Sequence, residues 1–144
     1  MGLIMEEMKR FNYLTSEIDA AYHDVALKLG LSDSAMQVLY AICNNGESCL
    51  LSDICKLSGT SKQTINSALR KLEAEDVVYL QSFNGKQKRV CLTENGKVLV
   101  KNTVVRLIEI ENAIFGSWTK EDQDMYLALT QRYLASFKEK IKEL

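Results

Sequence analysis

The stretch that decides the fold is residues 61–93, which read SKQTINSALRKLEAEDVVYLQSFNGKQKRVCLT. In its first half, apolar residues recur at the spacing of a helix, so one face of the predicted helix is apolar. The residues of that face are Ile65, Ala68, Leu69 and Leu72. The residues that fall on the opposite face are Gln63, Asn66, Ser67 and Arg70. A helix that only completes a core does not need such a polar face, so the pattern indicates a binding surface.

The second half of the stretch predicts a β-hairpin. Two runs rich in β-forming residues, Val77–Ser82 and Arg89–Leu92, are separated by a basic segment that contains a glycine. This spacing puts Lys86, Lys88 and Arg89 at or near the tip of the hairpin. A helix followed by a charged hairpin is the plan of a winged helix-turn-helix, in which the helix reads the DNA major groove and the hairpin reaches the neighbouring backbone or minor groove.

The segment before this stretch predicts the rest of a helix-turn-helix. Ser32 begins a helix that ends at Asn44–Gly46, and residues 47–51 are long enough for one strand, a third strand for the wing sheet. Ser52 is predicted to cap a short helix, and Ser58–Thr60 to turn the chain into the helix that Ser61 caps. Two short helices joined by a tight turn, the second polar outward, are typical of a helix-turn-helix.

Long amphipathic helices are predicted on both sides of this unit. One runs over residues 4–29, a second from Thr93 through Phe115, and a third from Thr119 to the C-terminal end of the sequence. Because they carry more apolar surface than a small winged domain can cover, we expect part of it to pack against a second subunit, although intrachain core packing explains any single residue equally well. The predicted fold is mainly α with a small antiparallel β wing.

The domain organisation follows from these elements. We expect a dimerisation helix over residues 1–30, a winged helix-turn-helix over residues 31–93 and further dimerisation helices over residues 94–144.

The charge is unevenly distributed along the chain. The 144 residues carry a formal net charge of −1, which is unusual for a nucleic-acid binder. Between Lys56 and Arg89, however, seven basic residues face three acidic ones, which leaves eleven basic and sixteen acidic residues elsewhere. A local basic surface on an acidic body suits a protein whose phosphate contacts come from one side.

Other classes of protein find little support. Four cysteines, at positions 43, 49, 55 and 91, form no CxxC pair, and there is a single histidine, so neither a zinc site nor any cofactor is predicted. No apolar run is long enough to span a membrane, and the N-terminus does not read as a secretory signal, so we expect a cytoplasmic protein with reduced thiols. No nucleophile motif, phosphate-binding glycine loop or second histidine indicates an enzyme.

Three segments in order resemble the MarR family of bacterial winged-helix regulators: LSDSAMQVLYAI, SDICKLSGTSKQTINSALRKLEAEDVVYLQ and NGKQKRVCLTENGK. The most specific part is the run Val90, Leu92, Thr93 and Gly96. The resemblance implies a homodimer, a roughly palindromic DNA site, and repression relieved by a small ligand, by oxidation or by a metal. Where wings of the family commonly carry Asp and, two residues on, Arg, this chain has Asn84 and Lys86. Lysine lacks the planar fork of arginine that favours minor-groove insertion.

The candidate DNA contacts lie on the helix and the hairpin. Arg70 is predicted to donate twice to guanine, and Gln63 and Asn66 to pair with adenine. The residues predicted to hold phosphates or the minor groove are Ser61, Lys62, Thr64, Ser67, Lys71, Lys86, Lys88 and Arg89. Each could instead be an ordinary solvated side chain.

The prediction of an effector site comes from the family resemblance. Members of the family that bind small aromatic acids do so between the helical layer and the winged domain, and the resemblance implies a pocket lined by Tyr13, Tyr22, His23, Met36 and Tyr40. Plain packing explains these residues as well. Two alternatives remain open: a thiol-based redox regulator that uses one of the four cysteines, and a winged-helix module for protein–protein assembly without specific DNA binding.

Overall fold

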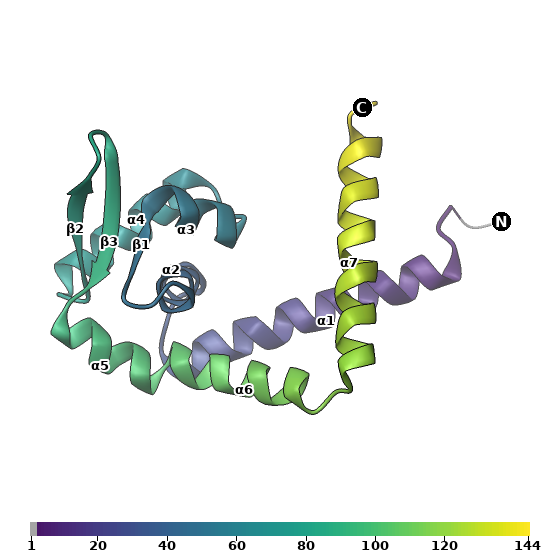
Figure 1. The fold of residues 1–144 in the computed structure, drawn as a ribbon, viewed down its shortest axis with the longest axis horizontal. Coiled ribbons are helices and arrows are strands. Elements are labelled where there is room, and N and C mark those ends of the chain that lie inside the picture. Colours follow the sequence, from purple (N-terminus) through teal and green to yellow (C-terminus); the bar gives the residue numbers. More distant parts are fainter. Residues whose placement is uncertain (1–2) are drawn as a thin grey trace. The chain divides into compact units, whose positions relative to one another are not determined.

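The computed structural model describes residues 3–144 of the chain. The helices are α1 (Glu6–Leu29), α2 (Asp33–Asn44), α3 (Leu51–Ser58), α4 (Lys62–Ala74), α5 (Glu94–Asn102), α6 (Val104–Gly116) and α7 (Lys120–Ile141). The strands are β1 (Ser48–Leu50), β2 (Val78–Phe83) and β3 (Gln87–Leu92), in the antiparallel order β1-β3-β2 (Figure 1). The predicted fold class, mainly α with a small antiparallel wing, is confirmed.

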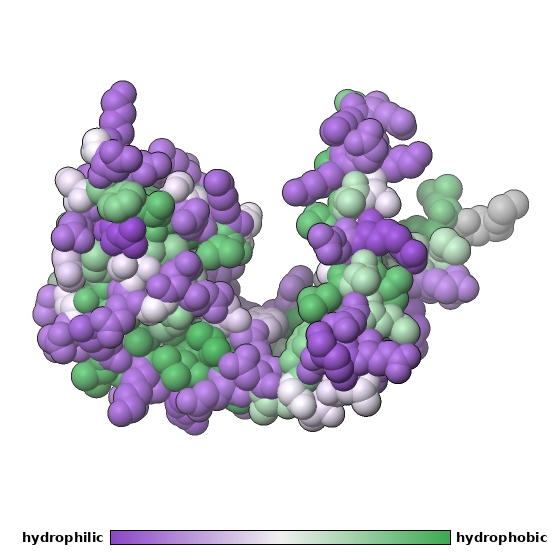
Figure 2. Space-filling view, in the orientation of Figure 1, coloured by the Kyte–Doolittle hydropathy of each residue, from purple (hydrophilic) through white to green (hydrophobic). Residues whose placement is uncertain are grey.

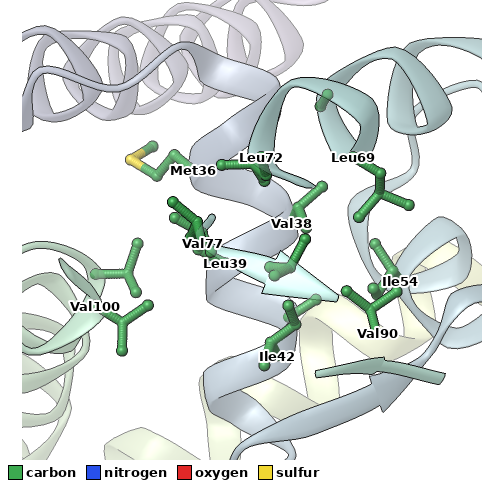
Figure 3. Packing of buried hydrophobic residues seen from close by; sticks show 14 of the residues in the cluster. Met36, Val38, Leu39, Ile42, Ile54, Leu69, Leu72, Val77, Val90 and Val100 are labelled. Carbon is green, nitrogen blue, oxygen red and sulfur yellow. The ribbon is translucent and has the colours of Figure 1, made fainter. Parts of the chain in front are cut away.

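The core forms around α2, which packs against both α3 and α4. Val38, Leu39 and Ile42 of α2 are fully buried, and they meet Leu69 of α4 and Val90 of β3 in the cluster drawn in Figure 3. Burial of side chains of this size contributes about 1.5 to 3 kcal/mol each relative to exposure. The core therefore fixes α2, α3, α4 and the wing sheet as one unit.

Most predicted helix boundaries are confirmed by their caps. The hydroxyl groups of Ser32, Ser61, Thr93 and Thr119 each accept a hydrogen bond from a backbone N–H in the first turn of the helix that follows. At the other end of α1, Gly30 adopts the left-handed conformation that ends a helix, with φ of 71°.

Two boundaries were predicted wrongly. The cap of α3 is Leu50, not Ser52, because β1 runs directly into the helix and leaves no residue between them. The single helix predicted from Thr93 through Phe115 is two helices, α5 and α6, which are separated at Thr103.

The break at Thr103 has a local cause. The Thr103 hydroxyl donates to the carbonyl of Leu99 at 2.7 Å, and the Thr103 N–H donates to Val100 instead of Leu99. Asn102 likewise donates its side-chain amide to the carbonyl of Val98 at 3.1 Å. At the Leu99 carbonyl the Thr103 hydroxyl takes the place of the Thr103 N–H, and the regular bonding pattern of the helix is interrupted there.

The chain divides into two compact units, one up to Leu107 and one over Ile108–Leu144. In the second unit, Phe115, Trp118 and Tyr126 form an aromatic cluster with ring centroids 4.9 to 5.8 Å apart, and Gln123 donates to the carbonyl of Phe115 at 2.6 Å. The predicted boundaries between the winged domain and the dimerisation helices, at residues 30/31 and 93/94, depend on which helices form the dimer. They stay a prediction.

The root of the wing is joined to α5 by a close backbone approach. The Thr93 hydroxyl donates to the carbonyl of Asp76 at 2.6 Å, and a Cβ atom added to Gly96 would lie 2.0 Å from the carbonyl oxygen of Val77. Only glycine fits at that distance. The T-x-x-G spacing of the sequence thus sets where α5 leaves the sheet.

Gly96→Ala is expected to lower the free energy of unfolding by about 1 to 3 kcal/mol, because backbone must move to admit the methyl group. Urea titration followed by circular dichroism measures the change. Gly116→Ala is the matched control, since nothing lies within 4 Å of its added Cβ. Equal stability of the Gly96→Ala variant and the parent would contradict the close approach.

Candidate nucleic-acid interface

The apolar face of α4 determines which residues the helix exposes. Ile65, Leu69 and Leu72 are buried in the core at 0 to 3% exposure. Residues on the other side of a helix must then face solvent, and Gln63 and Arg70 are exposed. The exposed polar face predicted for this helix is confirmed.

The exposed face of α4 also includes most of the other predicted contacts. Lys62, Thr64, Ser67 and Lys71 are exposed, and Asn66 is half-buried. The sequence from Ser61 to Leu72 contains no acidic residue, and the only carboxylate of α4 is that of Glu73, which lies exposed in the last turn of the helix. The first three turns of this face can therefore donate hydrogen bonds and approach an anion without a carboxylate among them.

Side-chain bonds fix the first turn of α4. Ser61 accepts from the backbone N–H of Thr64 at 3.2 Å and donates to the Thr64 hydroxyl at 2.9 Å. Just before it, the Thr60 hydroxyl donates to the Gln37 side chain at 2.7 Å and so ties the turn between α3 and α4 to α2. The contact between Thr60 and Gln37 joins residues far apart in sequence, and no local pattern indicates it.

The hairpin tip is a three-residue turn at Asn84, Gly85 and Lys86, between Phe83 and its partner Gln87. Asn84 and Gly85 both have positive φ angles, of 50° and 78°. Asparagine and glycine are the residues that adopt this conformation at low cost. The geometry of the turn is thus compatible with an asparagine at position 84 and a glycine at position 85.

The predicted cations of the hairpin divide into two groups. Lys86 in the turn and Lys88 in β3 are exposed. Arg89 is half-buried within β3, not at the tip, because the strand begins at Gln87 and not at Arg89. Its guanidinium donates to Ser48 Oγ at 3.1 Å and lies 4.6 Å from the ring centroid of Phe83.

Sequence reasoning missed Phe83 and Ser48 as members of this site. A signal was available for Phe83, which shares one face of β2 with Tyr79 and Gln81 by simple alternation. Nothing in the sequence alone pairs Ser48 with Arg89, since the contact depends on the register of β1 against β3.

The predicted effector residues lie in different environments. Met36 is buried in the core, Tyr40 is half-buried against it, and Tyr13, Tyr22 and His23 lie exposed on α1. Tyr13 and His23 are ten residues apart on one helix, about 15 Å along its axis, more than the length of a small aromatic acid. His23 Nδ1 lies 2.9 Å from the carboxylate of Asp33, which joins α1 to the first turn of α2. An effector pocket at these residues stays a prediction.

The cysteines are spread over the core and its edge. Cys49 and Cys91 are buried, and Cys43 and Cys55 are half-buried. Burial raises the pKa of the Cys43 thiol, and burial followed by the charge of Asp53 raises the pKa of Cys49. The raised pKa of both thiols disfavours the thiolate, which is the reactive form of a cysteine.

The sequence also predicted no metal site and no membrane span, and the structure bears on both for the described residues. Within residues 3–144, no group of three histidine, cysteine or acidic side chains is placed to hold a metal ion. In the same range, no helix is long and apolar enough to cross a membrane.

Taken as geometry, a helix-turn-helix with an exposed polar second helix and a basic antiparallel hairpin defines a winged helix-turn-helix protein. Residues 29–89 match the family model described as MarR family. No curated protein matches the chain in sequence.

Solved structures share the fold over nearly the whole chain. A MarR family regulator from Neisseria meningitidis is 19% identical, with a TM-score of 0.78 and coverage of 94% of this chain and 96% of that one. MepR of Staphylococcus aureus in complex with DNA is 18% identical, with a TM-score of 0.67 and coverage of 93% and 99%. BpsR of Bordetella bronchiseptica, whose DNA binding is regulated by 6-hydroxynicotinic acid, is 18% identical, with a TM-score of 0.63 and coverage of 86% and 98%. The resemblance to MarR-family winged-helix regulators is confirmed by these matches together.

The rate of alkylation tests whether the cysteine thiols are protected by the fold. With N-ethylmaleimide at neutral pH, Cys43 and Cys49 should react more slowly in the folded protein than in guanidinium, because burial limits both access and thiolate formation. Mass spectrometry of quenched time points measures each site. Equal rates in the two conditions would contradict the burial argument.

Proposed function

We propose that this protein is a DNA-binding transcriptional regulator that acts as a homodimer and has no enzymatic activity. The observation that carries the proposal is the exposed polar face of α4, which has no acidic residue before Glu73 in the last turn, beside a hairpin with two exposed lysines. A helix held in this way by its buried face is suited to the major groove, and the hairpin to the adjacent backbone.

The residues of α4 take different roles in this proposal. Arg70 donates in a bidentate manner to guanine O6 and N7, and Gln63 and Asn66 read adenine. The shorter side chains and lysines of α4, together with Lys86 and Lys88, hold phosphates and fix the register. The sequence-independent part of the affinity then comes from the local excess of positive charge.

Dimerisation is supported by the apolar surface of the long helices. On α7, Tyr126, Tyr133 and Phe137 are 45 to 51% exposed, and Phe11 and Ile18 on α1 are 44% and 51% exposed. Figure 2 shows hydrophobic atoms among hydrophilic ones along α7. Apolar stripes of this size are typical of an interface between subunits. Two recognition helices in a dimer would meet successive major grooves when they lie about 34 Å apart.

Regulation in this proposal is repression relieved by a small molecule. The DNA complex of MepR and the regulation of BpsR by 6-hydroxynicotinic acid are precedents at the level of fold. An effector would favour a dimer arrangement in which the spacing of the two recognition helices no longer suits one duplex. A thiol switch at Cys43 or Cys49 is less well supported, because burial raises the pKa of both thiols.

Arg70→Ala is expected to weaken binding to a specific site by about 1 to 3 kcal/mol, because a bidentate base contact is lost. A fluorescence anisotropy titration measures the change, against a duplex that the protein selects from a random DNA pool and against a scrambled duplex of the same composition. Lys138→Ala, an exposed lysine of α7, is the control and should bind like the parent. Identical affinities for the Arg70→Ala variant and the parent would remove Arg70 from the interface.

Salt dependence distinguishes DNA binding from a role in protein assembly. The parent affinity should fall steeply with added salt, and Lys86→Ala should reduce the slope of log K against log salt by about 1. An affinity insensitive to salt would favour the protein–protein alternative, whose apolar interface releases few counterions.

Deletion of residues 119–144 is expected to convert the dimer into a monomer, because it removes the exposed stripe of α7. Light scattering after size-exclusion chromatography measures the mass. A truncated chain that still has the mass of a dimer would contradict the proposed helical layer.

A further inference from the structure

The β2–β3 hairpin has a third strand beside it over only part of its length. β1 pairs with β3 at three positions, and the last of them is Leu50 opposite Arg89. Beyond this point only β2 and β3 pair, at Ser82 with Lys88 and at Phe83 with Gln87. The hairpin extends past β1 as a two-stranded ribbon (Figure 1). Such a ribbon is marginally stable by itself in water, so residues 82–88 need another source of order.

Arg89 lies at the point where three strands become two. From the central strand its guanidinium donates to Ser48 Oγ of β1 at 3.1 Å and packs on the ring of Phe83, the last residue of β2, at 4.6 Å. One side chain thus links the supported part of the sheet to the far end of the unsupported ribbon.

Arginine is suited to both contacts at once. Its planar guanidinium donates a hydrogen bond at its edge while its face stacks on an aromatic ring. Lysine carries the same charge as a compact ammonium group and cannot maintain the two contacts in this arrangement. The chemistry of the site therefore depends on the shape of the cation and not only on its charge.

The two lysines of the hairpin differ from Arg89. Lys86 and Lys88 are exposed, and within the part of the chain that the structure describes no ion pair engages either of them. Lys86 lies in the turn and Lys88 is paired with Ser82, so both belong to the unsupported part of the hairpin. Their positions depend on the order of that segment.

We propose that Arg89 is a positioning residue of the wing. Through Ser48 and Phe83 it holds the end of the hairpin in place, and so sets where Lys86 and Lys88 meet the DNA backbone. This assignment rests on the proposed DNA-binding function and replaces a direct phosphate contact by Arg89.

Two variants separate the shape of this contact from its charge. Phe83→Leu removes the ring and no charge, and Arg89→Lys keeps the charge and removes the planar fork. Gln87→Ala, an exposed change opposite Phe83, is the matched control. Circular dichroism melting confirms that each variant is folded.

The first measurement is hydrogen–deuterium exchange of the free protein. Both variants should lose protection over residues 82–88 while the amides of α2 stay protected, and Gln87→Ala should match the parent. Unchanged protection over residues 82–88 in both variants would overturn the proposal.

The second measurement is the salt dependence of DNA binding. Phe83→Leu should reduce the slope of log K against log salt by about 1 for each lysine displaced, although it removes no charge. A reduced slope for Arg89→Ala with parental slopes for Phe83→Leu and Arg89→Lys would make Arg89 an ordinary phosphate contact. If the parent itself binds no duplex DNA, the proposed function fails, and the exchange experiment still decides whether Arg89 orders the hairpin.

Discussion

Burial of one face of α4 against α2 is the constraint on which the rest of the structure depends. Ile65, Leu69 and Leu72 cannot leave the core without exposing large apolar side chains, so the rotation of the helix about its axis is fixed. Gln63 and Arg70 then have no alternative to solvent, or to a ligand that replaces solvent. The same contacts that stabilise the fold therefore direct the polar face of α4 outward, and this is the face that we propose to bind DNA.

A second constraint acts at the root of the wing. The approach of Gly96 to the Val77 carbonyl, together with the hydrogen bond from Thr93 to Asp76, joins the hairpin to α5 without a flexible connection. The hairpin is therefore tied to the core at its root, and the contact of Arg89 with Phe83 is a side-chain link toward its tip. In the proposal above, the root positions the hairpin and the far part carries the phosphate contacts of Lys86 and Lys88.

Much of this architecture could be predicted from the sequence. Local features were predicted correctly, namely the helix caps at Ser32, Ser61 and Thr93 and the apolar spacing of α4. Each of them depends only on residues that are neighbours in the chain, so the sequence is enough to predict it. The break at Thr103 was missed because a threonine within an apolar run usually continues a helix, and its hydroxyl bond to Leu99 depends on the rotamer.

The candidate site was predictable to a lesser extent. The exposed face of α4 follows from periodicity alone, but the contact of Thr60 with Gln37 and that of Arg89 with Ser48 join residues far apart in sequence. Arg89 was therefore grouped with Lys86 and Lys88 by composition, whereas the strand register places it in a different environment. Charge runs predict that a surface is basic, and they do not predict which of its cations already have a partner within the protein.

The proposed DNA recognition is tested most directly by selection of bound fragments from a random pool of duplex DNA with the 144-residue protein, followed by sequencing. We expect enrichment of a two-fold symmetric motif whose half-sites are centred about one helical turn, roughly 34 Å, apart. Its guanine and adenine positions should lose selectivity when Arg70 and Gln63 are replaced. Enrichment of no motif, or of a single half-site without a symmetric partner, would contradict it.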